Sequence, residues 1–179
     1  ILDEDYSVIF LGDIVDRGNY GYECLVLIFL LKLINPMNVY INRGNHEEMH
    51  TSSAFGFRNE LMAKKFSMDD HKKIIHETMG LSHSALMIKD PYTNKYVWLS
   101  HGFAPFVRPD INSSLKPHDS VTNISVLNLG DQLVDDVMND KDPDSKFQIG
   151  YQMRWNDFTS KHFTREPKRG IGHYLGTKC

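Results

Sequence analysis

Short apolar runs that alternate with polar segments divide the first part of the chain into strands and a helix. Residues 7–11 are mainly β-branched or aromatic and end at a glycine, which is typical of a buried strand. Residues 22–34 are good helix formers and stop shortly before Pro36. A second apolar run at residues 39–42 follows, so the sequence predicts a β-α-β unit with two parallel neighbouring strands.

The pattern then predicts two helices and a hairpin. The helices are expected at residues 55–65 and 69–79, and Asp69 is a suitable N-cap for the second. Residues 85–88 and 96–100 are apolar runs on either side of a turn rich in Asp, Pro and Asn. That arrangement is typical of a β-hairpin.

The pattern is weaker beyond residue 110. Residues 109–123 are polar and contain prolines, which indicates a loop. Residues 124–138 carry apolar side chains at helical spacing. We therefore expect an amphipathic helix there, with an acidic exposed face.

Composition and charge are typical of a soluble globular protein. The chain has 179 residues, of which 41% are hydrophobic and 24% charged, enough for one domain with a sizeable core. The net charge of −3 lacks the basic excess of nucleic-acid-binding proteins. The longest apolar run falls well short of the roughly 20 residues that span a bilayer. The two cysteines fit a reducing compartment, so we expect a cytoplasmic protein. From the charge and the short apolar run we expect neither nucleic-acid nor membrane partners.

Three of the predicted strands end in residues that can bind a metal ion. Asp13 follows the first strand, Asn45 the second and His101 the hairpin. Ligands in open α/β sheets bind at the carboxyl ends of the strands, so we expect these side chains to converge. Carboxylate, amide and imidazole groups suit hard or borderline divalent cations. Taken alone, Asn45 is more typical of a turn residue after a glycine.

The same segments contain a proton carrier and a phosphate ligand. His46 directly follows Asn45 and can carry a proton near neutral pH. Arg17 offers a planar fork of donors for phosphate oxygens. Metal ligands, a proton carrier and a phosphate ligand together indicate a metallophosphoesterase.

Ordered motifs across nearly the whole chain resemble those of the phosphoprotein phosphatases, in the calcineurin-like metallophosphoesterase superfamily. The motifs are Gly12-Asp13-x-Val15-Asp16-Arg17-Gly18, Arg43-Gly44-Asn45-His46-Glu47, Leu99-Ser100-His101-Gly102, Trp155-Asn156-Asp157 and Arg169-Gly170-x-Gly172. The resemblance implies an α/β fold, a four-layer α/β/β/α β-sandwich flanked by helices, in a single catalytic domain over residues 1–179. It also implies hydrolysis of phosphoserine and phosphothreonine monoesters.

The resemblance implies two divalent metal ions and some of their ligands. Asp13 matches the carboxylate that bridges the two ions, and Asn45 and His101 match ligands of the second ion. A bridging carboxylate holds two ions roughly 3.5–4 Å apart, which suits activation of water and neutralisation of phosphate charge. Such ligands accept manganese, iron, zinc and magnesium, so the native metal stays open.

The resemblance also assigns the catalytic and phosphate-binding residues. His46 matches the acid that protonates the leaving alkoxide, and Asp16 matches the carboxylate that orients it. Arg17 and Arg169 match the two arginines that bind the substrate phosphate. Arg169 also lies in a basic stretch, so a plain surface role is the alternative for it.

The chain departs from the family pattern at both ends. A Gly-Asp-x-His motif before residue 7 would supply an aspartate and a histidine to the first metal ion, and a further histidine would follow the Arg169 motif. Neither is present. We expect residues 1–179 to be the core of a longer domain, incomplete at both ends, that does not bind two metal ions tightly by itself.

Other positions are expected to shape or support the site. Phe103 stands where the family has a second glycine after the histidine, so we expect a reshaped substrate groove. His173 occupies a position that is often aromatic and is expected to line the pocket. Trp155 and Asp157 are expected to pack and to orient the site rather than to react.

The sequence leaves three functions open. The first is a metal-dependent protein phosphatase for phosphoserine and phosphothreonine or, with a reshaped groove, phosphotyrosine. The second is a hydrolase for diadenosine polyphosphates or other small phosphoesters, and the third is a non-catalytic phosphate-binding or scaffold protein. The intact set of motif residues argues against the third. The first is the leading function, with a phosphoprotein substrate and regulatory subunits as expected partners.

Overall fold

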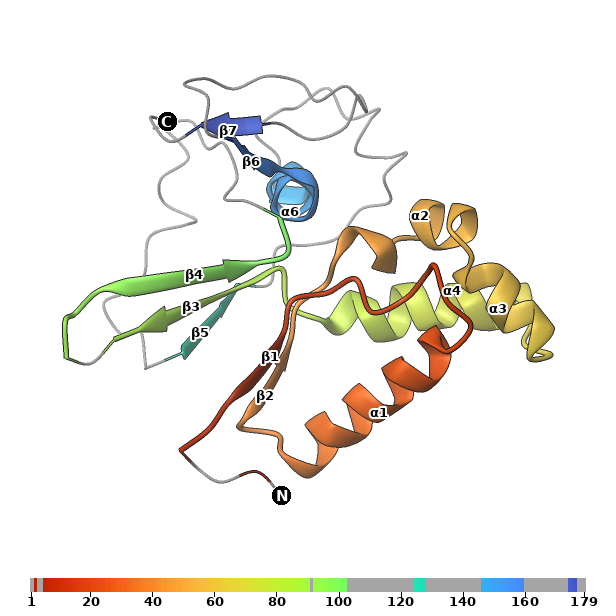
Figure 1. Ribbon diagram of the computed structural model, residues 1–179, viewed down its shortest axis with the longest axis horizontal. Helices are drawn as coiled ribbons and strands as arrows, with labels where there is room; N and C mark the ends of the chain where they lie inside the picture. Colours follow the sequence, from red (N-terminus) through yellow and green to blue (C-terminus); the bar gives the residue numbers. More distant parts are fainter. Residues whose placement is uncertain are drawn as a thin grey trace. The chain divides into compact units, whose positions relative to one another are not determined.

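The computed structural model describes residue 2 and residues 5–90, 92–102, 124–127, 146–159 and 174–176 (Figure 1). The chain divides into two compact units, Ile1–His83 and Ser84–Cys179. The first unit contains the β-α-β segment and the helices after it. The second contains the hairpin and the C-terminal elements.

The first unit begins with two strands connected by a helix. These elements are β1 (Val8–Phe10), α1 (Gly21–Ile34) and β2 (Val39–Ile41). Val8 pairs with Val39 and Phe10 with Ile41 in a parallel arrangement. The predicted β-α-β unit is confirmed. Because the strands run in the same direction, the loops that follow them leave the pair at the same edge.

Short helices complete the first unit. They are the 3₁₀ turn η1 (Asn45–Glu47), the α-helices α2 (Met49–Ala54), α3 (Phe57–Ala63) and α4 (Met68–Lys72), the π-helical turn η2 (Lys73–Thr78) and the 3₁₀ turn η3 (Met79–Leu81). The helix predicted at residues 55–65 is α3. The helix predicted at residues 69–79 is α4 followed by η2.

The N-cap of α4 is Ser67, so the prediction of Asp69 as the cap was wrong. The Ser67 hydroxyl accepts a hydrogen bond from the Asp70 N–H at 3.1 Å, and the Asp70 carboxylate accepts one from the Ser67 N–H at 2.7 Å. This reciprocal capping box satisfies two backbone N–H groups at once, and it places Asp69 inside the first turn.

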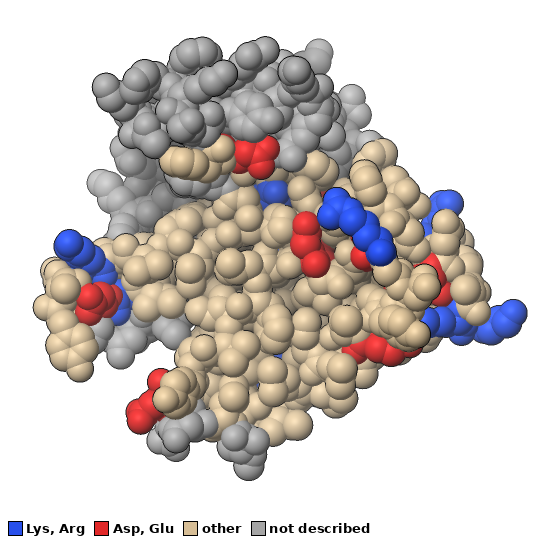
Figure 2. All heavy atoms as spheres, viewed as in Figure 1, with Lys and Arg blue, Asp and Glu red and all other residues tan. Residues whose placement is uncertain are grey.

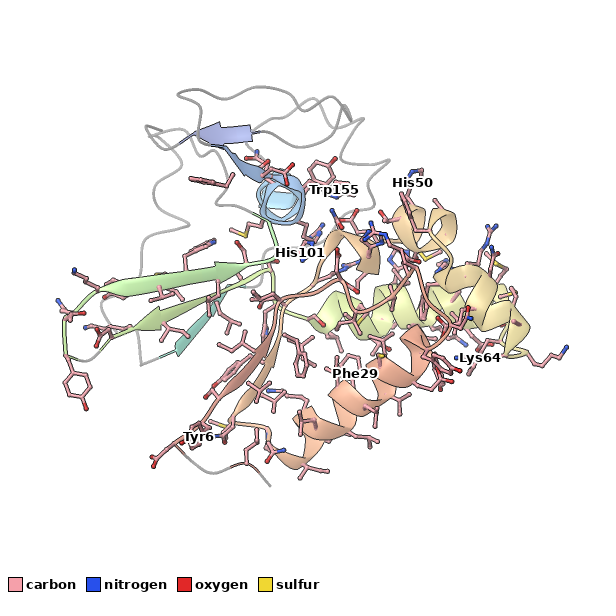
Figure 3. All side chains as sticks on the ribbon, in the orientation of Figure 1. Tyr6, Phe29, His50, Lys64, His101 and Trp155 are labelled. Carbon is pink, nitrogen blue, oxygen red and sulfur yellow. The ribbon has the colours of Figure 1, made fainter. Side chains whose placement is uncertain are left out.

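The core of the first unit lies between α1, α3 and the π-helical turn. Its buried apolar side chains are Val15, Leu25, Phe57, Leu61, Ile75 and Met79. Phe29 points from α1 toward this cluster and packs against it (Figure 3). Burial of one such side chain contributes roughly 1.5–3 kcal/mol. Val15 belongs to the loop after β1, so this loop is anchored in the core.

Glu60 of α3 caps the N-terminus of α1. Tyr20, the residue before α1, makes no side-chain cap. The buried Glu60 carboxylate instead accepts hydrogen bonds from the N–H groups of Gly21 at 3.0 Å and Tyr22 at 2.9 Å. A carboxylate stabilises a helix start because it satisfies unpaired N–H groups and faces the positive end of the helix dipole. Lys64 donates to the same carboxylate at 2.9 Å.

The second unit contains an antiparallel sheet with the strand order β4-β3-β5. Its strands are β3 (Ala85–Lys89), β4 (Tyr96–Ser100) and β5 (Ile124–Leu127). Ala85 pairs with Ser100, and Lys89 pairs with Tyr96. The predicted hairpin is therefore confirmed.

Strand β5 shows that the helix predicted at residues 124–138 does not begin at residue 124. Ile124–Leu127 instead pair antiparallel with β3. The sequence Ile124-Ser125-Val126 alternates β-branched and polar residues, which suits a strand on a sheet edge. The rest of the predicted helix, residues 128–138, lies outside the described residues.

The C-terminal elements are a helix and a parallel strand pair that the sequence pattern did not predict. They are α6 (Lys146–Trp155), β6 (Asp157–Thr159) and β7 (Tyr174–Gly176). Trp155 is buried, and its ring centre lies 6.0 Å from that of Tyr151, as expected for a packing residue. The Gly102 N–H donates to the Met153 carbonyl at 2.6 Å, which joins the segment after β4 to α6.

The outer face of α1 is apolar. Leu27, Leu30, Leu33 and Ile34 are between 48% and 74% exposed. Figure 2 shows few charged side chains over this helix on the face turned to the viewer. Within the described part of the chain, no helix has both the length and the hydropathy needed to cross a membrane.

Candidate active site

The loops after β1 and β2 approach each other through two glycines. A β-carbon on Gly12 would lie 2.2 Å from the backbone nitrogen of Gly44, and one on Gly44 would lie 2.4 Å from the backbone nitrogen of Asp13. Neither position has room for a side chain, so glycine is required at both. This close approach brings the motifs at residues 12–18 and 43–47 together.

The loop after β1 contains several residues in the left-handed region. The φ angle is 94° at Gly12, 55° at Asp13, 77° at Asp16 and 57° at Arg17. For residues with a β-carbon such conformations cost of order 1 kcal/mol each and persist only where the surrounding structure imposes them. Three of these residues carry predicted site groups, so the backbone strain lies at the candidate site.

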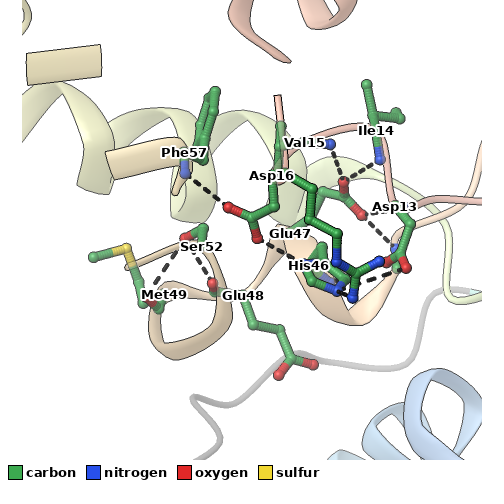
Figure 4. A network of polar contacts seen from close by, with 12 residues as sticks. Asp13, Ile14, Val15, Asp16, His46, Glu47, Glu48, Met49, Ser52 and Phe57 are labelled. Carbon is green, nitrogen blue, oxygen red and sulfur yellow. Dashed lines mark hydrogen bonds and ion pairs between the residues drawn. The ribbon is translucent and has the colours of Figure 1, made fainter. Parts of the chain in front are cut away.

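Glu47 holds this loop with a buried carboxylate (Figure 4). Its Oε2 accepts hydrogen bonds from the N–H groups of Asp13 at 2.8 Å and Gly44 at 2.9 Å. Its Oε1 accepts from Ile14 at 2.6 Å and Val15 at 3.2 Å. Burial raises the pKa of the Glu47 carboxyl group and the Asp13 carboxylate adds to the rise, whereas the bonds from the N–H groups of Asp13, Ile14 and Val15 oppose it.

His46 and Asp16 form a buried pair. The Nδ1 atom of His46 lies 2.6 Å from Oδ2 of Asp16, whose side chain is completely buried. The other Asp16 oxygen accepts a hydrogen bond at 2.7 Å from the N–H of Phe57, the first residue of α3. The carboxylate is thus held by α3 and in turn orients the His46 ring. The structure brings the predicted pair together, and its catalytic role stays a prediction.

Arg17 contacts the other ring nitrogen of His46. Its Nη2 atom lies 2.9 Å from Nε2. Because a guanidinium has only donors, Nε2 accepts this bond, and the ring carries its proton on Nδ1, toward Asp16. The guanidinium also lies 5.7 Å from the centre of the Phe55 ring. Arg17 is an exposed residue, so a phosphate group from solvent can reach it.

Asp13 and Asn45 offer oxygen atoms to a cation beside this pair. One Asp13 oxygen accepts a hydrogen bond from the His46 N–H at 3.1 Å, and the side chain is 33% exposed. Among the described residues, the buried Oδ1 atom of Asn45 has no hydrogen-bond partner. A buried oxygen without a partner is costly, and a divalent cation that prefers oxygen ligands would satisfy it. The donor set of this unit therefore fits a metal ion.

The predicted site residues divide between the two units. Those in the first unit are Asp13, Asp16, Arg17, Asn45 and His46. His101 follows β4 in the second unit (Figure 3), and its convergence with Asp13 and Asn45 stays a prediction. Asp157 begins β6. Nowhere in the described residues do three or more His, Cys, Asp or Glu side chains gather as a metal-binding group.

Three other positions with expected roles lie outside the described residues. They are Phe103, Arg169 and His173. The second phosphate-binding arginine, the reshaped groove and the pocket-lining histidine therefore stay predictions.

The sequence pattern did not predict the roles of Glu47 and Phe57. Glu47 lies three residues after Gly44, the spacing at which a glutamate accepts from the N–H before a helical turn, and this signal predicts its bond to Gly44 but not its bonds to the loop after β1. The Phe57 N–H reaches Asp16 across 41 residues of sequence. A backbone contact over that distance leaves no local sequence signal.

Comparison with known proteins identifies the class of protein that this fold and site define. Residues 2–179 match the calcineurin-like phosphoesterase family. The chain belongs to this family, as the motifs predicted.

The chain is similar to serine/threonine phosphatases over part of their length. It is 36% identical over 109 residues to the serine/threonine-protein phosphatase 2B catalytic subunit A2 of Saccharomyces cerevisiae, a match that covers 60% of this chain and 17% of that protein. It is 28% identical over 173 residues to the serine/threonine-protein phosphatase T of Aspergillus oryzae, which covers 97% of this chain and 31% of that protein. The chain thus spans less than a third of the length of these relatives.

A solved structure shows the same fold. It is a protein serine/threonine phosphatase from Saccharomyces cerevisiae with similarity to human phosphatase PP5. The TM-score is 0.63 at 22% sequence identity, and the match covers 98% of this chain and 46% of that chain. The predicted calcineurin-like fold is confirmed.

Proposed function

We propose that this chain is the catalytic part of a metal-dependent phosphoprotein phosphatase that hydrolyses phosphoserine and phosphothreonine monoesters. The observation that carries the proposal is the His46–Asp16 pair at 2.6 Å with Arg17 against the other ring nitrogen. A proton donor, its carboxylate partner and a phosphate-binding guanidinium are groups that phosphomonoester hydrolysis needs. The two relatives named above are serine/threonine phosphatases, which supports a protein substrate.

Asp13, Asn45 and His101 are the proposed metal ligands. Membership of the family implies divalent metal ions, and the partnerless Asn45 oxygen supports a cation at this position. Held by these residues, divalent cations would supply Lewis acidity toward the attacking water and positive charge toward the phosphate. We propose two ions, and manganese, iron, zinc and magnesium all suit these ligands.

His46 is the proposed acid. An unprotonated serine or threonine alkoxide is a poor leaving group, so its departure requires a proton. Because Nδ1 faces Asp16, the nitrogen that would deliver this proton is Nε2. Arg17 donates to the same Nε2 atom, so Nε2 could carry and deliver this proton only once Arg17 had turned its guanidinium from the ring to the phosphate. Arg169 is the second proposed phosphate-binding residue.

The other two functions use part of the same site. A hydrolase for diadenosine polyphosphates or other small phosphoesters would differ in how it recognises the leaving group. A non-catalytic phosphate-binding protein would need Arg17 but not a histidine oriented by a buried carboxylate. The His46–Asp16 pair therefore favours catalysis. Regulatory subunits are proposed partners, and the cytoplasm is the proposed location.

The test is phosphate release by the intact protein from phosphoserine, phosphothreonine and phosphotyrosine peptides, with and without Mn²⁺. The proposal expects turnover that needs Mn²⁺ and falls by about two decades or more in the His46→Asn variant. Diadenosine polyphosphate serves as the comparison substrate. Hydrolysis of this dinucleotide without any peptide turnover would favour the small-phosphoester function, and bound Mn²⁺ without any turnover would favour the non-catalytic one.

A further inference from the structure

We propose that Glu47 is a positioning residue for the metal site: its buried carboxylate holds the backbone of Asp13 in the conformation that presents the Asp13 carboxylate to a metal ion. The inference rests on the proposed function, because it concerns the metal site of that function. It adds a residue that neither the motifs nor the family resemblance assigned a role.

The first step is the origin of the hydrogen bonds that Glu47 accepts. Three of the donors are the consecutive residues Asp13, Ile14 and Val15, and the fourth is Gly44 of the other motif. Successive N–H groups that point at one anion form a concavity that left-handed residues help to create. The positive φ angles of Gly12 and Asp13 occur at this concavity. The Glu47 side chain thereby holds the backbones of the two motifs at a fixed distance from each other.

The second step is the effect on Asp13. Its backbone N–H is bound to Glu47 at 2.8 Å, and one of its carboxylate oxygens is bound to the His46 N–H at 3.1 Å. The backbone and the side chain of Asp13 are therefore both hydrogen-bonded to the segment that contains Asn45. Without the Glu47 carboxylate, the neighbouring N–H groups would lose their acceptor, and the φ angle of 55° at Asp13 would lose its support.

The third step excludes a direct role for Glu47 in metal binding. A carboxylate has about four acceptor positions, and the four backbone bonds occupy them. The residue is also 0% exposed. Glu47 therefore acts through Asp13, as residues that orient metal ligands commonly do.

Glu60 provides a matched control within the same unit. It is also a buried glutamate, 7% exposed, and it accepts hydrogen bonds from the backbone N–H groups of Gly21 and Tyr22. Its bonds hold the start of α1 rather than a residue with a predicted metal role. Loss of either carboxylate disturbs the fold, but only loss of Glu47 should disturb metal binding.

The experiment compares Glu47→Gln with Glu60→Gln in the intact protein. Glutamine keeps the length of the side chain but places an NH₂ group against backbone N–H donors. We expect Glu47→Gln to weaken Mn²⁺ binding, measured by isothermal titration calorimetry, and to lower kcat for p-nitrophenyl phosphate, each by about 10- to 100-fold. Glu60→Gln should lower the melting temperature while its Mn²⁺ affinity changes by less than about threefold.

The outcomes separate this inference from the proposed function. If the unchanged protein binds Mn²⁺ and the Glu47→Gln variant binds it equally well, the inference is wrong and the proposed function stands. If both variants lose Mn²⁺ affinity to the same extent, Glu47 is a structural residue only and the inference is also wrong. If the unchanged protein neither binds Mn²⁺ nor releases phosphate, the proposed function fails and the inference fails with it.

A second measurement covers the case in which Glu47→Gln does not fold. Amide hydrogen exchange of the unchanged, metal-free protein reports directly on the four donors. Slow exchange at Asp13, Ile14, Val15 and Gly44 is expected, because Glu47 holds them without the help of a metal ion. Exchange as fast as in an exposed loop would overturn the inference.

Discussion

Two regions of the first unit each contain a buried histidine, and their surroundings differ. His46 is 6% exposed and His71 is 0% exposed, and each ring lies near the ring of a phenylalanine. His46 faces the carboxylate of Asp16 with one nitrogen and the guanidinium of Arg17 with the other. Among the described residues, the hydrogen-bond partner of His71 is the uncharged hydroxyl of Ser52, 2.9 Å from its Nε2. Burial is common to both rings, so the charged partners distinguish the candidate catalytic histidine.

The surroundings of His71 suit a neutral structural residue. Burial lowers the pKa of its imidazole, and the positive charge of Arg58 lowers it further. Its Nδ1 atom has no hydrogen-bond partner among the described residues. The bond to Ser52 joins α4 to α2. The same residue type thus serves packing in one region and proposed proton transfer in the other.

The largest expected effect is on catalysis. His46→Asn should lower kcat for a phosphoserine peptide by about 10²- to 10⁴-fold, because the leaving alkoxide loses its proton donor. The loss should be smaller for p-nitrophenyl phosphate, whose leaving group departs without a proton. His71→Asn is the matched control and should leave kcat within about threefold of the unchanged protein at a temperature where it is folded. Equal losses in the two variants would remove the distinction between the two regions.

The next effect tests the carboxylate partner of His46. Asp16→Asn should lower kcat by about 10- to 100-fold, because an amide whose oxygen accepts from the Phe57 N–H turns its NH₂ group toward Nδ1 of His46 and does not stabilise the protonated ring. The melting temperature should fall little, since the asparagine oxygen can still accept from the Phe57 N–H. Steady-state kinetics and thermal unfolding measure the two quantities. A large loss of stability with little change in kcat would contradict the proposed role of Asp16.

Ser52→Ala tests the corresponding partner of His71. The substitution leaves the buried Nε2 atom of His71 without a partner and removes a bond to the Glu48 carbonyl. We expect the free energy of unfolding to fall by about 1–2 kcal/mol, with kcat unchanged at temperatures where the variant is folded. Urea denaturation measures the first quantity. An unchanged midpoint would show that the Ser52–His71 bond does not contribute to stability.

The smallest effect is the pH dependence of stability. The pKa of His71 is lowered from its ordinary value of 6.5 in the folded protein, so below this pH the unfolded chain binds a proton that the folded chain does not. Stability should therefore fall as the pH drops below 6.5, with a slope of at most about 1.4 kcal/mol per pH unit from this residue. Unfolding at a series of pH values should show a shallower slope for His71→Asn than for the unchanged protein. Identical slopes would contradict a lowered pKa.

The local sequence pattern was sufficient to predict those elements whose residue types are recognisable over a short stretch of chain. The β-α-β unit, α3 and the hairpin were predicted because strand runs, helix formers and turn residues mark them within a few positions. Strand β5 was missed because its pairing with β3 depends on a neighbour far along the chain. Helix α6 and the strand pair β6–β7 likewise lacked a clear local period.

The candidate site shows the same division. Asp16 and His46 were predicted as a pair from the family resemblance, through their places in two motifs, and the structure brings them within 2.6 Å of each other. The bonds that hold the pair come from elsewhere: Phe57 binds Asp16 across 41 residues. The motif contains Glu47, but the sequence did not reveal that Glu47 supports the loop after β1. That role depends on burial and on four converging N–H groups.

The hydrogen bonds at the starts of α1 and α3 connect these two helices and the loop after β1 to one another. Asp16 accepts from the first N–H of α3, Glu60 of α3 accepts from the first N–H groups of α1, and α1 follows the loop that contains Asp16. For protein engineering, this means that the motifs alone are not the smallest part of the site that could be transplanted. A graft onto another scaffold would have to carry α1 and α3 with it, because α3 supplies both the N–H that binds the Asp16 carboxylate and the carboxylate that caps α1.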